Sequence, residues 1–366
     1  MHSIRMKFAL LVAVVAVTFL APSSVRVVAQ APVLTMASIA SLTFGPDGTL
    51  FAADNQNAAI VALDLGAQAG AGAAGAKGLD GIDEKLAAML GTGAGDISIT
   101  DLAVHPRTHN AYISAMRGQG AGAAPTLFRI DGTGKIDLVS MPALKFQRVE
   151  LPNAPAAGGT GRGNARANVI TDMAFADGRL WVAGLSNEEF ASKLRAIPYP
   201  FRSADQGTSV EIYHGNHRQL ETRSPVNQFV PYTIDNKPYL LAGYTCTPLV
   251  KFQIADLKPG DKVRGTTIGE FGAGNRVLDM IVYKKAGQEF LLTTNNSRGV
   301  MKIPTRTFAT AAPITTPVET ETGGVPFEKI TTMTGIQQMD KLDEEHSIVI
   351  ARAASGSLSL QVVPLP

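Results

Sequence analysis

The sequence is poor in cysteine and in aromatic residues, and it has no excess of charge of one sign. It contains one cysteine, Cys246, and one tryptophan in 366 residues, and aromatic residues make up 6% of the chain. A single thiol cannot form an internal disulfide, so the fold depends on packing alone. Lys and Arg total 33 against 31 Asp and Glu. This balance argues against a nucleic-acid partner, which would require a concentrated basic surface.

Long apolar runs are also missing, except at the N-terminus. Arg5 and Lys7 precede an apolar run at residues 8–20, and Ala29 and Ala31 are small residues of the kind that a signal peptidase reads. The run is shorter than the ~20 residues of a membrane-spanning helix. We therefore predict that residues 1–31 are a secretory signal peptide, with an uncleaved anchor as the alternative. The rest of the chain is then periplasmic or secreted, without a membrane span.

Strong catalytic signatures are absent as well. The sequence has no CxxCH haem motif, no Gly-x-Ser-x-Gly elbow and no His pair with an evident zinc spacing. The glycine-rich residues 158–163 lack the GK[ST] ending of a phosphate-binding loop. They belong to a basic loop, residues 141–168, that could meet an acidic partner.

One short phrase returns six times along the chain. It begins with Ile or Val, continues with any residue and then a polar residue, and ends with Leu, Met or Phe. The copies start at Ile39, Ile99, Ile170, Val226, Val277 and Ile336. Their starts are 51 to 71 residues apart, which is the length of one four-stranded sheet with its loops. We therefore predict an all-β fold, a β-propeller.

Six blades account for the six copies, and residues 32–366 then form a single propeller domain. A seventh blade hidden in residues 141–168 or 305–330 is the alternative. The chain ends after the third strand of the sixth blade, so we expect residues 33–36 to supply its fourth strand and close the ring.

Two short helical insertions interrupt the β pattern. Residues 80–90 have apolar residues at helical spacing. Ser186 and Glu189 have the spacing of a capping box at the start of a second helix.

The repeated polar position lies on one face of the propeller. The loops that lead into the first strands lie on this face, together with the hairpins between the second and third strands. Asp101, Asp172 and Asp279 occupy this position in three copies. Converging carboxylates could bind a divalent cation such as Ca²⁺, with Asn55 and Asn295 completing an oxygen shell. The alternative is that each side chain binds backbone amides of the adjacent blade.

The hairpins on this face supply four candidate ligand-binding residues, which are Asn55, Cys246, Asn295 and Arg298. Asn295 and Arg298 could hold a sugar, a carboxylate or a phosphate, although polar turns are also common in hairpins. Cys246 could act as a nucleophile beside a histidine or a cation. No histidine can be assigned to it from the sequence, and a buried, inert thiol is the other interpretation.

The phrase LTFGPDGTLFAAD at residues 42–54 resembles a blade of the NHL or SMP-30/gluconolactonase-type propellers, and residues 99–115 are similar to it with a longer turn. Residues 185–191 and 276–283 resemble segments of exported bacterial propellers without an assigned activity. Lactonases of the SMP-30 type use a carboxylate at the opening of the first blade, with Asn and Asp from later blades, around one divalent ion. Ser41 stands at that opening position here, so the sequence departs from the lactonase pattern.

These observations favour a non-catalytic, exported binding module that docks a protein or a small ligand on the face described above. The alternative is a metal-dependent hydrolase or lactonase that uses Asp101, Asp172 and Asp279.

Overall fold

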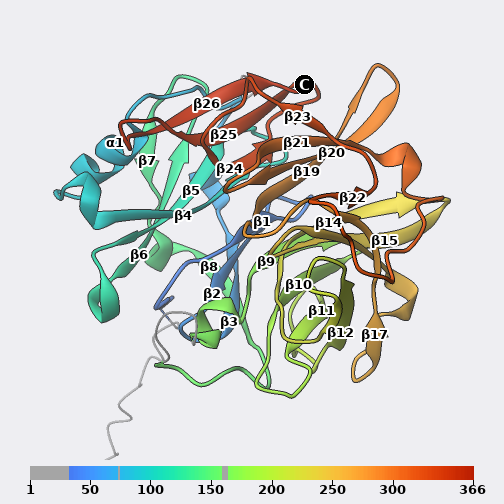
Figure 1. Cartoon of the computed structure of the whole chain (residues 1–366). Helices are drawn as coiled ribbons and strands as arrows, with labels where there is room; N and C mark the ends of the chain where they lie inside the picture. The colour runs from blue at the N-terminus through green and yellow to red at the C-terminus, as the bar shows by residue number, and fades with distance from the viewer. Residues whose placement is uncertain (1–32, 73–74, 159–163) are drawn as a thin grey trace, which may run out of the picture. The chain divides into compact units, whose positions relative to one another are not determined.

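Six sheets, whose strands are antiparallel except for one parallel pair, make up the computed structural model of the chain (Figure 1), and a cavity lies between their inner strands. The structure describes residues 33–72, 75–158 and 164–366, and residues 34–366 form one compact unit. The predicted signal peptide lies outside the described residues. No helix among the described residues is long and apolar enough to span a membrane.

Each sheet is one blade, and the blades are numbered one to six by the position of their first strand in the chain. Blade one contains β1 (Leu42–Phe44), β2 (Leu50–Asp54), β3 (Ala59–Asp64) and β8 (Lys145–Glu150), and blade two contains β4 (Ile97–Val104), β5 (Ala111–Arg117), β6 (Ala124–Ile130) and β7 (Ile136–Leu138). Blade three contains β9 (Asp172–Ala176), β10 (Arg179–Leu185), β11 (Ser192–Pro198), β12 (Thr208–His214) and β13 (Gln219–Glu221). Blade four contains β14 (Val226–Ile234), β15 (Lys237–Tyr244), β16 (Pro248–Gln253), β18 (Thr266–Glu270) and β22 (Gly323–Gly324). Blade five contains β19 (Val277–Lys285), β20 (Gln288–Asn295), β21 (Gly299–Pro304) and β23 (Glu328–Ile330), and blade six contains β24 (Ile336–Lys341), β25 (His346–Arg352) and β26 (Leu358–Pro364).

The prediction of an all-β propeller with six blades is confirmed. The two stretches in which a seventh blade was considered instead complete other sheets. Residues 145–150 are the outer strand of blade one, and β22 and β23 are the outer strands of blades four and five.

One of the two predicted helical insertions is present. The helix α1 (Ile82–Met89) lies within residues 80–90. The second prediction is wrong, because residues 186–191 form the loop that joins β10 to β11. Leu185 pairs with Ser192 in the ladder, and Ser186 N donates a hydrogen bond to the Ala191 carbonyl at 2.8 Å. The loop is therefore too short for a helix, and the Ser186 hydroxyl bonds to Glu188 rather than to Glu189.

The blades do not follow one another around the channel in chain order. Six clusters of buried apolar residues fill the six interfaces, which join blades one and two, two and six, six and five, five and four, four and three, and three and one. Blade two therefore lies between blade one and blade six. The chain leaves blade one after β3, builds blade two, and returns to complete blade one with β8 before it continues to blade three.

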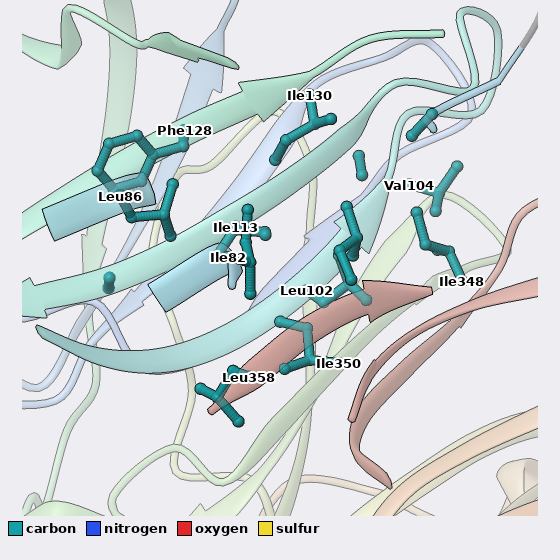
Figure 2. Close-up of a cluster of buried hydrophobic side chains, with 14 of the residues drawn as sticks. Ile82, Leu86, Leu102, Val104, Ile113, Phe128, Ile130, Ile348, Ile350 and Leu358 are labelled. Atoms are coloured by element: carbon teal, nitrogen blue, oxygen red, sulfur yellow. The ribbon is translucent and has the colours of Figure 1, made fainter. Parts of the chain in front are cut away.

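The interface between blades two and six shows how α1 contributes to the core (Figure 2). Ile82 and Leu86 of α1 are fully buried and belong to the same cluster as Ile113 of β5 and Ile350 of β25. The apolar spacing that predicts this helix thus corresponds to a face that packs between two blades.

The outer edge of blade six is covered by the connection between blades one and two. Leu79 N donates to the Leu360 carbonyl at 2.7 Å, and Leu360 N donates to the Leu79 carbonyl at 2.9 Å. The prediction that residues 33–36 close the ring is wrong, because these residues form no strand and Leu34 is buried between blades one and two. A sequence pattern cannot show this, since the pairing rests on backbone groups of an irregular segment.

Other outer edges are covered in a similar way. The strand β17 (Lys262–Arg264), from the connection between β16 and β18 of blade four, pairs in parallel with β12 of blade three. The strand β22, which follows β21 of blade five, pairs with β18 of blade four. Segments borrowed from a different blade thus cover edges that would otherwise be open to pairing with another chain.

We expect Leu79→Pro to destabilise the protein, because proline removes the amide that bonds to the buried Leu360 carbonyl. The free energy of unfolding should fall by about 1–3 kcal/mol, the cost of an unsatisfied buried acceptor. Leu79→Ala keeps both main-chain hydrogen bonds and is the control. Equal denaturant midpoints for the two variants would contradict this account of the closure.

Candidate functional site

The repeated phrase of the sequence marks a bulge in the inner strands. The ladder between the first two strands of a blade shifts its register between Ile99 and Asp101, and it shifts at the corresponding place in blades four, five and six. A bulge leaves one residue unpaired and changes the direction of its neighbours. The polar side chains at this position then line the channel, as they do at Asp101, Gln228 and Asp279.

Four aspartates come together in the channel, in a cavity of about 160 Å³. They are Asp101, Asp172 and Asp279, as the sequence predicts, and in addition Asp340 of β24. Asp340 stands two residues after Gln338, which holds the repeated polar position in blade six. Its position outside the repeat explains why the pattern alone does not find it.

Each aspartate accepts hydrogen bonds from two backbone amides. One amide belongs to the next residue of the same strand, and the other belongs to the inner strand of a neighbouring blade. The amide donors are Leu102 (2.8 Å) and Leu42 (2.6 Å) for Asp101, Met173 (2.8 Å) and Phe229 (2.7 Å) for Asp172, Met280 (2.8 Å) and Met339 (2.8 Å) for Asp279, and Lys341 (2.7 Å) and Val104 (2.7 Å) for Asp340.

Burial raises the pKa of all four carboxyl groups. It brings the pKa of Asp101 to about 7 and that of Asp340 to about 6, and it holds those of Asp172 and Asp279 well above the ordinary value of 3.8. Repulsion between carboxylates adds to the effect for Asp101, Asp172 and Asp279, and the amide hydrogen bonds oppose it without cancelling it. The aspartates therefore hold protons in a pH range where exposed carboxyl groups are ionised.

A divalent cation fits this arrangement poorly. Both oxygens of each carboxylate already face the positive ends of N–H dipoles, which would also face a cation placed between them. The two carboxamide ligands that the sequence predicts, Asn55 and Asn295, do not join the ring that the four aspartates form in the channel. Asn55 donates to the carbonyls of Ala167 and Ile170, and Asn295 accepts from the amides of its own hairpin at Ser297 and Arg298. The geometry favours the interpretation that the aspartates bind backbone amides of adjacent blades.

A second cavity, of about 230 Å³, forms the mouth of the channel. Gln228 lines both cavities and so marks where they adjoin. Arg276 lines this mouth and also an adjacent cavity of about 600 Å³ between blades two, five and six. The polar side chains around Arg276 in the mouth are Asn55, Asn168, Thr171, Asn227, Gln228 and Gln338.

Of the four residues that the sequence proposes for ligand binding, Asn55 lines this mouth. Arg298 forms an ion pair with Glu321, and Asn295 is buried in the hairpin beside it. Cys246 is buried in the hairpin between β15 and β16. The structure therefore does not bring these four residues together in one cavity among those described.

The structure also gives Cys246 the histidine partners that the sequence could not assign. One ring nitrogen of His214, one of His217 and the Cys246 sulfur all lie within 4.8 Å of one another. The spacing His214-x-x-His217 is visible in the sequence and was the available signal. Its relation to Cys246 depends on the packing of blade three against blade four.

No protein-family model and no curated protein sequence matches this chain. Among solved structures it is similar to a Thermus thermophilus protein described as an oxidoreductase (glucose dehydrogenase), with 12% identity, a TM-score of 0.37, and 90% of this chain and 97% of that chain covered. It is also similar to the PQQ-bound aldose sugar dehydrogenase of Streptomyces coelicolor, with 12% identity, a TM-score of 0.32, and 91% of this chain and 98% of that chain covered. A third similar structure is an engineered GH43 glycoside hydrolase with endo-xylanase and exo-arabinofuranosidase activity. It has 14% identity and a TM-score of 0.32, and 70% of this chain and 48% of that chain are covered. Similarities of this size transfer no activity, and the NHL or SMP-30 relationship stays a prediction.

The raised pKa values predict a pH dependence of stability. A carboxyl group whose pKa is higher in the folded state than in the unfolded state holds its proton more firmly when folded, so stability is lost as the pH rises. For Asp101 and Asp340 this loss extends from about pH 4 to about pH 7. We expect the melting temperature to fall between about pH 4 and about pH 7.

Asp101→Asn provides the control for this effect, since it removes one titrating group. Burial lowers the pKa of His105, with the charge of Arg107 adding to the effect, and this group contributes a slope of opposite sign. The comparison should therefore be made between the two proteins at each pH. An unchanged slope in Asp101→Asn would show that Asp101 does not titrate in this range.

Calcium tests the two interpretations of the ring. If the aspartates bind only backbone amides, Ca²⁺ added to the chelator-treated protein leaves the melting temperature unchanged, and this is the result we expect. A metal site held at 100 times its dissociation constant would instead add about 2.7 kcal/mol of stability. A calcium-dependent rise that disappears in Asp101→Asn, Asp172→Asn and Asp279→Asn would contradict our interpretation.

Proposed function

We propose that this protein is an exported, non-catalytic binding module that holds a small, polar, anionic ligand at the mouth of its channel. The observation that carries this proposal is the convergence of one guanidinium, that of Arg276, with five carboxamide side chains around a single cavity. The signal peptide predicted at residues 1–31 supports a periplasmic or extracellular location.

The chemistry of the mouth suits a ligand with both hydroxyl and carboxylate groups. A carboxamide offers a donor and an acceptor, so several of them can bind hydroxyl groups. An arginine can bind a carboxylate through two parallel hydrogen bonds. A sugar acid carries both kinds of group.

Arg276 is free to bind such a ligand. Its side chain is exposed and forms no salt bridge with a carboxylate of the described residues. Its backbone is fixed, because Arg276 N donates to the Asn296 side chain at 2.7 Å and the Arg276 carbonyl accepts from Asn296 N. A fixed backbone reduces the loss of freedom on binding.

The aspartate ring below the mouth does not oppose an anion as strongly as four ionised carboxylates would. Burial raises the pKa of each aspartate, so part of the ring is protonated near neutral pH. The residues that line the mouth include no acid, histidine or cysteine among those described, which favours binding over acid–base or nucleophilic chemistry. A lactonase would need the ring to provide that chemistry, and its oxygens are engaged with backbone amides.

Arg276→Gln tests the proposal. Gluconate, galacturonate and citrate should be screened by thermal shift, with glucose as the uncharged comparison, and the best ligand measured by calorimetry. Losing a hydrogen bond to a charged group costs about 1.5–3 kcal/mol, so we expect the affinity to fall about tenfold or more.

Arg306→Gln is the matched control, since it removes a guanidinium that bonds to Gln288 rather than one at the mouth. Binding should be unchanged in this variant. Failure of every anion in the panel to bind, or equal binding by Arg276→Gln, would overturn the proposal.

A further inference from the structure

A second site lies between blades three and four, and its three residues are not among those that line the mouth. His214 ends β12, His217 lies in the turn that follows it, and Cys246 lies in the hairpin between β15 and β16. One ligand atom from each of the three side chains lies within 4.8 Å of the others. We propose that these three residues bind a transition-metal ion of the zinc class.

The types of ligand suit zinc. Two imidazole nitrogens and one thiolate form a set that Zn²⁺ accepts in proteins, whereas Ca²⁺ and Mg²⁺ prefer oxygen ligands. The two blades contribute the ligands jointly, so a bound ion would connect them.

Glu221 orients both imidazoles. Its Oε1 atom lies 3.1 Å from Nδ1 of His214 and 2.5 Å from Nδ1 of His217. Zinc-binding histidines commonly contact a carboxylate through the nitrogen that does not bind the metal. With Nδ1 of each ring facing Glu221, the Nε2 atoms remain as ligands.

His214 provides an independent observation. Its side chain is 1% exposed, and its Nε2 atom forms no hydrogen bond among the described residues, since Oε2 of Glu270 lies 3.7 Å away. A buried ring nitrogen without a hydrogen-bond partner is unfavourable. A metal ion at Nε2 would satisfy it.

Glu270 lies beside the three ligand residues, although it is not part of their cluster. It is fully buried, and its Oε2 atom lies 3.7 Å from Nε2 of His214. Its other oxygen, Oε1, accepts a hydrogen bond from Gly215 N at 2.6 Å, which fixes the carboxylate beside the histidines.

The ion can reach this site from the surface. A cavity of about 460 Å³ is lined by His217, Glu221 and Thr245, the residue before Cys246. His217 is exposed, so its ring forms the outer wall of the metal site.

Zinc and cobalt titrations of the purified full-length protein test the site. After dialysis against a chelator, we expect one equivalent of Zn²⁺ to bind and to raise the melting temperature. Co²⁺ at the same site should give the charge-transfer absorption of a cobalt–thiolate bond, which reports Cys246 directly. Zn²⁺ should also slow the alkylation of Cys246 by iodoacetamide.

His217→Ala and Cys246→Ser should each weaken Zn²⁺ binding at least about tenfold, since each removes a ligand. The exposed position of His217 makes its variant the safer one for folding, which the metal-free melting temperature checks. His346→Ala is the matched control, because His346 also contacts a carboxylate, that of Asp343 at 3.0 Å, but is not part of the cluster. No binding of Zn²⁺ or Co²⁺ by the wild-type protein, or binding by both ligand variants as tight as that of the control, would overturn the proposal.

Discussion

The bridge from an aspartate carboxylate to two backbone amides is the interaction on which the centre of this propeller depends. Asp101, Asp172, Asp279 and Asp340 join four of the six blade interfaces in this way. The other two interfaces use different bonds. Asn55 donates to carbonyls of blade three, and Cys246 N donates to the Asn275 carbonyl between blades four and five. Every interface thus has a polar connection in addition to its apolar cluster.

This construction places acidic groups where burial disfavours their charge. The raised pKa values are the consequence, and they let the charge of the centre change with pH. The mouth above the ring then offers a guanidinium without a fixed anion beside it. The structural role of the centre and the binding that we propose at the mouth thus use one channel.

The sequence predicts the inner strands well because the same short phrase recurs in each blade, and in four of the six blades it marks a bulge. The phrase identifies Asp101, Asp172 and Asp279, but not Asp340, because the contact of blade six with blade two is displaced by two residues along the strand. The order of the blades is not encoded in any local pattern. The order depends on which apolar faces of the blades fit one another. Leu102 of blade two, for example, belongs to the same buried cluster as Ile350 of blade six.

The loop at residues 186–191 shows how a local signal can mislead. Ser186 and two glutamates have the composition of a helix start, but the pairing of β10 with β11 leaves no room for a helix. The cluster of His214, His217 and Cys246 shows the opposite case, a site that local sequence signals do not reveal. Nothing local in the sequence joins a turn of blade three to a hairpin of blade four. Such sites require the tertiary structure.

The position of blade two has a consequence for how the chain folds. Its residues come early in the chain, yet the bond from Val104 to Asp340 spans 236 residues. Contacts between distant residues form slowly because a long loop must close before they stabilise anything. The helix α1 covers part of the apolar face around Ile113 and Ile130, and the rest is covered only when the last blade is in place. A nascent chain thus presents apolar surface for most of its synthesis, and folding intermediates of this protein should be prone to aggregation and to capture by chaperones.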